Sequence, residues 1–287
     1  MNERIVEIIT DEILSLIRSE ARHSEKTVKT EISEITGLSK EKTVTTSLKT
    51  DAETDEVLAL LKKRTAARIG VGKTGARLKT DAYLNARGDY AIARDSVFKE
   101  VDEKYLHDLG LEIAKTCCKS KDEFLTRPDL GKTLAESAVS YVKNNCKKAD
   151  VLIYVSDGLS CSAVESNAKD ILPVITDGLK AHSISVSTPF FLKYGRVPAM
   201  DQVSEITGCK VVCVLIGERP GMATAESMSA YIAYNATVDM PEARRTVVSN
   251  IHSGGISPVE AGAYIVDVIM KMLEHKLSGV ELRERVW

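Results

Sequence analysis

Three glycine-containing loops carry polar residues of the kinds that hold a ligand. They are SDGLS (156–160), GERPG (217–221) and SNIHSGG (249–255), and each mixes small residues with polar ones. Glycine lets a ligand approach the backbone closely, and loops often carry binding residues. In GERPG a charged pair, Glu218 and Arg219, stands between two glycines. We interpret GERPG as a binding loop, whereas SDGLS fits a plain strand-to-helix turn equally well.

His252 is the one histidine of five that lies in a glycine-rich loop. The pattern Asn250-x-His252-x-x-Gly255 differs by one residue from the Asp-x-His-x-x-Gly signature with which some corrinoid proteins give a histidine to cobalt. Asn replaces the Asp that would orient and polarise the imidazole. We therefore favour a histidine that hydrogen-bonds the backbone and closes its loop, with cobalt ligation as the alternative. The other histidines are scattered and suggest no metal cluster.

Nucleotide, nucleic-acid and membrane partners are not indicated. GVGKT (70–74) resembles part of a phosphate-binding loop, but Ala67 stands where that motif needs a glycine, and a helix is expected where it needs a strand. No GxGxxG follows a strand, so a dinucleotide site is unsupported. The net charge of −2 gives no electrostatic footprint for nucleic acid. No apolar run reaches the roughly 18–20 residues that span a bilayer, and the acidic N-terminus does not fit a signal peptide.

The cysteines show no metal-binding or redox spacing. There is no CxxC pair, and Cys209 and Cys213 lie four apart on an expected strand, too far to share a metal. We expect buried, reduced thiols in a reducing cytoplasm. The six are Cys117, Cys118, Cys146, Cys161, Cys209 and Cys213.

Apolar runs rich in β-branched residues predict the strands that position the loops. VLIYVS (151–156) and KVVCVLI (210–216) are typical of strands buried on both faces, with HSISVSTPFFL (182–192) as a strand between them. Helices are expected after Ser160, a suitable N-cap, and over DQVSEIT (201–207). This alternation predicts an α/β fold with a doubly wound, mostly parallel sheet. Ligands bind such sheets at the carboxyl ends of the strands.

Capping residues mark the ends of several helices. Ser257, Pro258 and Glu260 form a capping box with proline at the first helical position, which predicts the start of the closing helix. Gly279 is expected to stop that helix, and Pro173 to kink or split an earlier one. The expected buried stripe of the closing helix consists of Ile265, Val268, Ile269 and Met272. Gly208 is the expected C-cap of the helix over 201–207.

Four regions follow along the chain. Residues 1–20 have isoleucines at helical spacing and predict an amphipathic helix, and 21–55 are polar and typical of a flexible linker. Residues 56–148 are predicted to be mostly helical, and residues 149–287 are predicted to form the sheet domain. An amphipathic helix on a polar linker either packs on the rest of the chain or binds a partner protein. The presence of the linker favours binding to a partner.

Seven motifs, in order, resemble the light (small) chain of ethanolamine ammonia-lyase, an adenosylcobalamin-dependent bacterial enzyme. The resemblance covers roughly residues 64–280 and implies a Rossmann-like cobalamin-binding domain. It also implies a radical lyase that converts ethanolamine to acetaldehyde and ammonia. The motifs are RIGVGKTGARLKT, ARGDYAIARDSV, FLTRPDLGKTL, VSDGLS, LIGERPG, RRTVVSNIHSGG and LSGV.

The resemblance implies a division of labour between two chains. In this family the heavy chain, a β/α barrel, holds the substrate and the catalytic groups, and the light chain lies over the corrin ring. The implied corrin contacts here are Val197, Glu218 and Val247, with no catalytic residue and no metal ligand. Relatives often carry cysteine where Val247 stands, so only a backbone contact would survive that change. The family keeps the cofactor's own benzimidazole on cobalt, which argues against ligation by His252.

The partners implied are the heavy chain and, through residues 1–20, shell or cargo proteins of an ethanolamine-utilisation microcompartment in the bacterial cytoplasm. The charged helix ARGDYAIARDSV (86–97) is either a solvated face or part of the heavy-chain interface.

Two other classes of function compete with the hypothesis of a cofactor-binding lyase subunit. One is a non-catalytic assembly or cargo-scaffold protein, and the other is a self-sufficient nucleotide-using α/β enzyme.

Overall fold

The computed structural model describes residues 53–65, 67–146 and 148–286. The chain divides into two units, Met1–Leu61 and Lys62–Trp287. The description begins with helix α2 (Glu53–Lys63), which runs across the boundary between the two units. Its last turn carries Lys62 and Lys63 at the negative end of the helix dipole. The helix predicted over 1–20 lies outside the described residues. No helix in the described ranges is long and apolar enough to cross a membrane.

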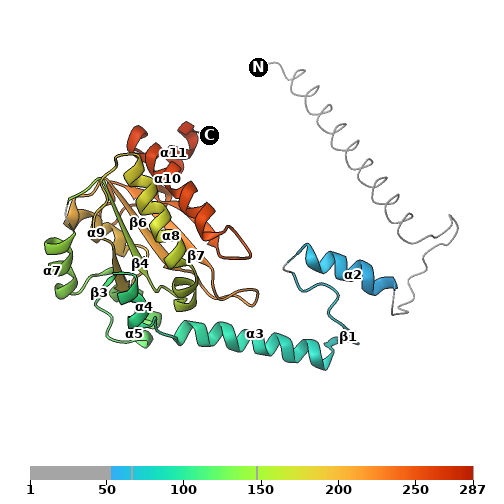
Figure 1. The fold of residues 1–287 in the computed structure, drawn as a ribbon. Coiled ribbons are helices and arrows are strands. Elements are labelled where there is room, and N and C mark those ends of the chain that lie inside the picture. Colours follow the sequence, from blue (N-terminus) through green and yellow to red (C-terminus); the bar gives the residue numbers. More distant parts are fainter. Residues whose placement is uncertain (1–52, 66, 147, 287) are drawn as a thin grey trace, which may run out of the picture. The chain divides into compact units, whose positions relative to one another are not determined.

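The second unit is built on a six-stranded sheet in the order β3-β5-β4-β6-β7-β8 (Figure 1). The first four strands in that order run parallel, and β7 and β8 add an antiparallel pair at one side. The α/β class with a mixed, mostly parallel sheet is thereby confirmed. The strands are β3 (Glu112–Lys115), β4 (Val151–Ser156), β5 (Phe190–Lys193), β6 (Val211–Gly217), β7 (Met228–Tyr234) and β8 (Thr246–Ile251).

Helices cover both faces of this sheet. Helices α8 (Cys161–Ala181) and α10 (Pro258–His275) pack on one face, and α7 (Glu136–Asn145) and α9 (Ala199–Thr207) on the other. Successive residues of β4 alternate between the two cores, because side chains of a strand point to opposite faces in turn. Every residue of β4 and β6 is buried, as the continuous apolar runs predicted.

Shorter elements complete the unit. Helix α3 (Thr80–Phe98) buries only Ala93 and Ser96 of its 19 residues. The remaining elements are β1 (Lys73–Thr74), β2 (Arg77–Leu78), α4 (Glu103–Asp108), α5 (Lys121–Thr126), α6 (Pro128–Lys132), η1 (Glu242–Arg244) and α11 (Gly279–Val286).

Capping predictions are confirmed at three helix ends. The Ser160 hydroxyl accepts from the Ala163 N–H at the start of α8, and the capping box of Ser257 and Glu260 opens α10. Gly208 closes α9 in the left-handed conformation, at φ 63°. The predicted stripe of α10 is buried.

Three features differ from the expectations. Pro173 was expected to kink or split α8, and the split does not occur, because the helix runs unbroken to Ala181. Helix α10 ends at His275 with Lys276 in the left-handed conformation, and Gly279 instead begins α11. The strand expected over 182–192 shrinks to the four residues of β5. Helix α8 packs against the sheet and α10, and this packing offsets the loss of the hydrogen bond that proline cannot donate.

Strands β3, β7 and β8 were not foreseen. The region 56–148 was expected to be mostly helical, yet it contributes β3 to one edge of the sheet. Strand β8 forms the opposite edge and is exposed at half of its positions. The two edge strands, β3 and β8, mix polar with apolar residues, so they lack the apolar run that made β4 and β6 recognisable. The boundaries of the four regions stay predictions.

Candidate functional site

The three candidate loops leave the sheet at one edge, which we call the carboxyl edge. It is formed by the carboxyl ends of β5, β4, β6 and β8, and β7 begins there. The register places Ser156 beside Ile216 and Leu192, and Met228 beside both Gly217 and Ile251. The loops after β4, β6 and β8 therefore start from neighbouring points, as expected for a sheet of this type.

Two of these loops are in close contact through glycine. The Leu159 N–H donates to the Gly217 carbonyl at 3.0 Å. A Cβ on Gly217 would lie 2.1 Å from the Ser160 carbonyl oxygen, and one on Gly158 would lie 2.4 Å from the Gly217 carbonyl. Gly158 also has a positive φ of 51°. The glycines of SDGLS and GERPG thus let the two loops pack against each other. They are required for this packing, whether or not they also leave room for a ligand.

A hollow of about 110 Å³ opens between these loops and the segment after β5. Val197 and Glu218 both line it, so the structure brings together two of the three predicted contact residues. The other lining residues are Phe124, Gly158, Leu159, Gly195, Arg196, Ile216, Gly217 and Tyr231. A space of this size holds a few water molecules, so a large planar ligand would lie across its mouth.

Glu218 is oriented by a tyrosine. The Tyr231 hydroxyl donates to Glu218 Oε1 at 3.1 Å, and the Glu218 N–H donates to the Ser227 carbonyl at 2.9 Å. Burial, together with the Glu218 charge, raises the pKa of Tyr231 to about 12, so the phenol stays a donor. Oε1 is therefore held in place, and a carboxylate has further lone pairs for an outside donor.

Val247 lies within β8, away from the carboxyl edge but on the same face of the sheet as Tyr231. It pairs directly with Tyr231, and directly opposed residues of antiparallel strands point to one side. Tyr231 and Val197 pack against the α7/α9 core, whereas Val248 is buried in the α8/α10 core. The Val247 side chain is 45% exposed. Val197 and Glu218 thus line one hollow, and Val247 lies beside Tyr231 on the edge strand, where it also lines a groove with Tyr264 and Val268 of α10.

Sequence reasoning missed Tyr231. It stands on β7, which was itself not predicted, and its hydrogen bond to Glu218 joins two strands. The available signal was the mostly apolar run MSAYIAY (228–234), which contains the strand-favouring residues Tyr231, Ile232 and Tyr234.

His252 closes its own loop. The Gly254 N–H donates to His252 Nδ1 at 3.1 Å, so Nε2 carries the proton, and Nε2 lies 2.9 Å from Asn250 Oδ1. Both ring nitrogens are used inside the loop, which confirms the loop-closing interpretation. Within the described ranges no three His, Cys, Asp or Glu side chains are grouped to hold a metal ion.

The cysteines are free thiols, as predicted. Burial raises the pKa of Cys146 to about 11 and that of Cys161 and Cys213 to about 12. These thiols therefore stay protonated and unreactive at neutral pH. GVGKT enters a two-residue hairpin formed by β1 and β2, which is not the strand–loop–helix of a phosphate loop.

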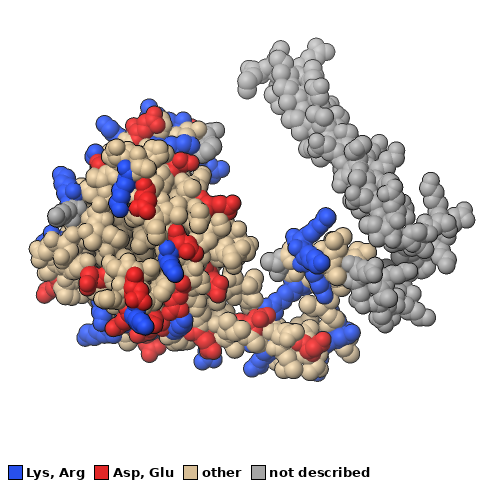
Figure 2. Space-filling model, viewed as in Figure 1, with Lys and Arg blue, Asp and Glu red and all other residues tan. Residues whose placement is uncertain are grey.

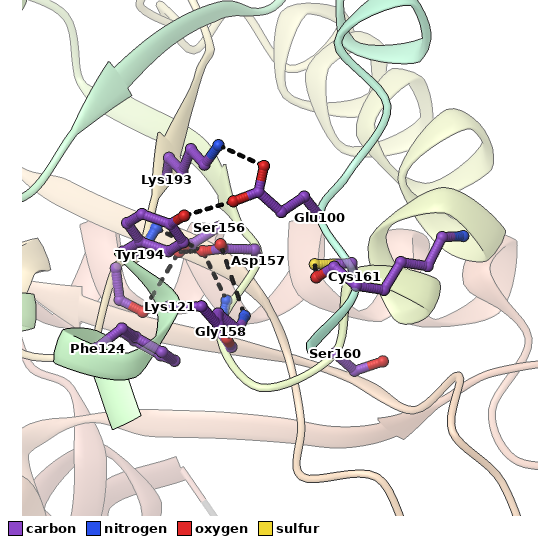
Figure 3. A network of polar contacts seen from close by, with 12 residues as sticks. Glu100, Lys121, Phe124, Ser156, Asp157, Gly158, Ser160, Cys161, Lys193 and Tyr194 are labelled. Carbon is purple, nitrogen blue, oxygen red and sulfur yellow. Dashed lines mark hydrogen bonds and ion pairs between the residues drawn. The ribbon is translucent and has the colours of Figure 1, made fainter. Parts of the chain in front are cut away.

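A buried polar network lies behind the hollow, and sequence reasoning did not single it out (Figure 3). At its centre Asp157, 3% exposed, accepts hydrogen bonds from the N–H groups of Gly158 and Tyr194. Lys121 of α5 donates to the Gly158 carbonyl at 3.2 Å. Further out, the Tyr194 hydroxyl and Lys193 both donate to Glu100.

Charges on the molecular surface are mixed. Figure 2 shows Lys and Arg interspersed with Asp and Glu over the face in view. That face offers no extended surface of one sign.

Comparison with known proteins finds close relatives over most of the chain. A model of the family described as "Ethanolamine ammonia-lyase light chain (EutC)" matches residues 55–283. The small subunit of ethanolamine ammonia-lyase from Clostridium tetani is 58% identical over 231 residues, which are 80% of this chain and 79% of that protein. The small subunits from Listeria innocua and Clostridium perfringens are 53% and 52% identical over 224 residues, covering 78% of this chain and 76% of theirs.

Proposed function

This chain belongs to the ethanolamine ammonia-lyase light-chain family, and we propose that it forms one wall of the cobalamin site in that enzyme. The other wall belongs to the heavy chain, which holds ethanolamine and the catalytic groups. The observation that carries the proposal is the hollow lined by Val197 and Glu218, with Tyr231 fixing the carboxylate and pairing with Val247.

Val197, Glu218 and Val247 fit a corrin. A corrin ring has apolar faces, and its rim carries amide groups that donate hydrogen bonds. Val247, which is exposed, offers an apolar contact, and the Glu218 carboxylate offers an acceptor for an amide N–H. The hollow is too small to enclose the ring, which supports a second wall from another chain. His252 uses both ring nitrogens in its loop, which suits a cofactor that brings its own axial base.

The bound cofactor, adenosylcobalamin, supplies the radical that starts the conversion of ethanolamine to acetaldehyde and ammonia. This chain's residues do no acid–base chemistry in that reaction. Glu218 binds and orients the corrin rim, while Val197 and Val247 cover apolar surface and exclude water.

Helix α3 supports contact with the heavy chain. Most of its large apolar residues are exposed, which is unusual for a helix of 19 residues. Arg68 pairs with Asp89 and donates to the Met222 carbonyl, so the start of this region is tied to the loop after β6. We assign the heavy-chain interface to the side of α3 that carries Tyr83, Leu84, Tyr90 and Phe98.

The direct test mixes the full chain with its heavy chain and adenosylcobalamin and follows ethanolamine-dependent release of acetaldehyde. We expect activity that heavy chain alone lacks. Equal activity of heavy chain alone would overturn the proposal and leave an assembly or scaffold role.

Glu218→Ala should weaken cobalamin binding by about 1.5–3 kcal/mol, the contribution of a hydrogen bond to a charged group. That is roughly a 10- to 150-fold rise in the dissociation constant, to be measured by equilibrium binding of cyanocobalamin to the two-chain complex. Glu226→Ala, an exposed carboxylate from the same loop, is the matched control and should bind as wild type does. Unchanged affinity of Glu218→Ala would remove Glu218 from the site.

Deleting residues 1–20 should spare activity and abolish co-localisation with shell proteins of the microcompartment. The amphipathic pattern of these residues and the polar segment after them support a targeting role. Fluorescence co-localisation in cells that form the compartments gives the measurement, with a Val57→Ala chain as the full-length control. Persistent packaging of the deleted chain would refute this assignment.

A further inference from the structure

We propose that Asp157 is a positioning residue for the cobalamin site, holding together the separate segments that form this chain's wall, with Lys121 as its partner. The inference rests on the proposed function and names two residues beyond those already assigned to contact the cofactor.

The Asp157 carboxylate joins the loops that follow two different strands. Its Oδ1 accepts from the Gly158 N–H at 3.0 Å and from the Tyr194 N–H at 2.7 Å (Figure 3). Gly158 follows β4 and lines the hollow, and Tyr194 follows β5 and leads directly into Gly195 and Val197, which also line it. One oxygen atom therefore bridges the two loops, beside the Ser156 hydroxyl, which donates to the Leu192 carbonyl at 2.8 Å.

Lys121 brings a third segment to the same point. Its Nζ lies 3.9 Å from Asp157 Oδ2, and it donates to the Gly158 carbonyl at 3.2 Å. It also lies 5.0 Å from the centre of the Phe124 ring, which is on the same helix and lines the hollow. One buried ion pair thus joins three segments: α5, the loop after β4 and the loop after β5.

Stability alone does not account for this pair. Lys121 is 9% exposed and Asp157 is 3% exposed, and taking two charges out of water commonly offsets their attraction. Burial raises the pKa of Asp157 to about 6, although Lys121 and the backbone N–H groups act in the opposite direction. Burial therefore disfavours the ionised form relative to water. At neutral pH, above this pKa, that form still predominates and accepts both N–H groups strongly.

Other ionisable groups around Asp157 are few. Tyr194 and Cys161 face it from the end of β5 and the start of α8, and burial raises the pKa of both. Glu100 lies beyond Tyr194, and hydrogen bonds from Tyr194 and Lys193 lower its pKa. Asp157 is thus the group of this network that changes charge between pH 5 and 7.

The test compares Asp157→Asn with Asp150→Asn in the two-chain complex, with cyanocobalamin as the probe. Asp150 is an ion-paired aspartate just before β4, at the opposite end of that strand, bonded to Lys210 and Ser185. At pH 7.5 we expect Asp157→Asn to bind cyanocobalamin at least tenfold more weakly and Asp150→Asn to bind it as wild type does. Wild-type affinity should fall as the pH drops through about 6, where Asp157 gains a proton, and Asp157→Asn should lack this step.

Lys121→Met is the second variant, and it leaves the two backbone bonds of Asp157 in place. Since Lys121 lowers the pKa of Asp157, its loss should move the midpoint of the pH profile upward. Wild-type affinity in Asp157→Asn, an equal loss in Asp150→Asn, or an unchanged midpoint in Lys121→Met would each overturn the inference. The proposed function fails separately, if the wild-type complex binds cyanocobalamin no better than heavy chain alone.

Discussion

Gly217→Ala is expected to destabilise the chain by on the order of 3 kcal/mol and to abolish cobalamin binding. The new methyl group would lie 2.1 Å from the Ser160 carbonyl oxygen and 2.5 Å from that of Asp157. Both are backbone atoms of the turn between β4 and α8, so neither can rotate away. The strand end must shift, which breaks the bond from the Leu159 N–H to the Gly217 carbonyl and displaces Glu218.

Urea unfolding of the full chain measures the free energy, and cyanocobalamin binding to the complex measures the site. Gly88→Ala is the control because it has the same change of side chain in the middle of α3, where nothing lies within 4 Å. Alanine there should stabilise the helix by about 0.5–1 kcal/mol. If the Gly217 and Gly88 variants unfold at the same urea concentration, the close packing of the two loops is wrong.

Arg245→Met is expected to destabilise the chain by about 3–5 kcal/mol at pH 8, because it removes one partner of a buried ion pair. Arg245 Nη2 donates to Asp201 Oδ2 at 2.6 Å, and their side chains are 2% and 3% exposed. Burial raises the pKa of Asp201 to about 6, and Arg245 acts against that rise. Without Arg245 the pKa of Asp201 rises further, and the carboxyl group takes up a proton more readily.

The loss should therefore depend on pH with a defined sign. A carboxyl group whose folded pKa is raised destabilises the fold fully above that pKa, and this penalty is lost progressively as the pH falls from the folded pKa to the unfolded one. The difference between wild type and Arg245→Met should shrink from pH 8 to pH 5 in urea unfolding. The double variant Arg245→Met with Asp201→Asn should recover part of the loss at pH 8. A loss of equal size at both pH values would contradict the assignment of the penalty to Asp201.

The parts of this fold that could be predicted were those determined by local sequence. Strands β4 and β6 are continuous apolar runs, and the starts of α8 and α10 are marked by Ser160 and by the Ser257 capping box. Strand β8 was missed because an edge strand with one solvent-facing side needs no continuous apolar run. Its place in the sheet depends on pairing with β7, and this pairing cannot be predicted from a short stretch of sequence.

The candidate site shows the same difference between residues recognisable from local sequence and residues that depend on contacts between distant segments. Glu218 was recognisable because two glycines and a proline surround it at the end of an apolar run. Tyr231 and the Lys121–Asp157 pair were not, because each acts through a contact between segments distant in the chain. Asp157 belongs to SDGLS, one of the three loops singled out from the sequence. An aspartate in a simple turn and an aspartate that positions two loops have the same local sequence, so only the arrangement of the neighbouring strands distinguishes them.

The burial of the native thiols makes this chain suited to site-directed labelling. Five of its six cysteines are buried and Cys117 is half-buried, so a maleimide dye meets little competing reactivity on the folded chain. Val247→Cys would place a single accessible thiol on the exposed middle of β8, beside Tyr231. A fluorophore attached there would report, by quenching, when a corrin and a second chain cover that face.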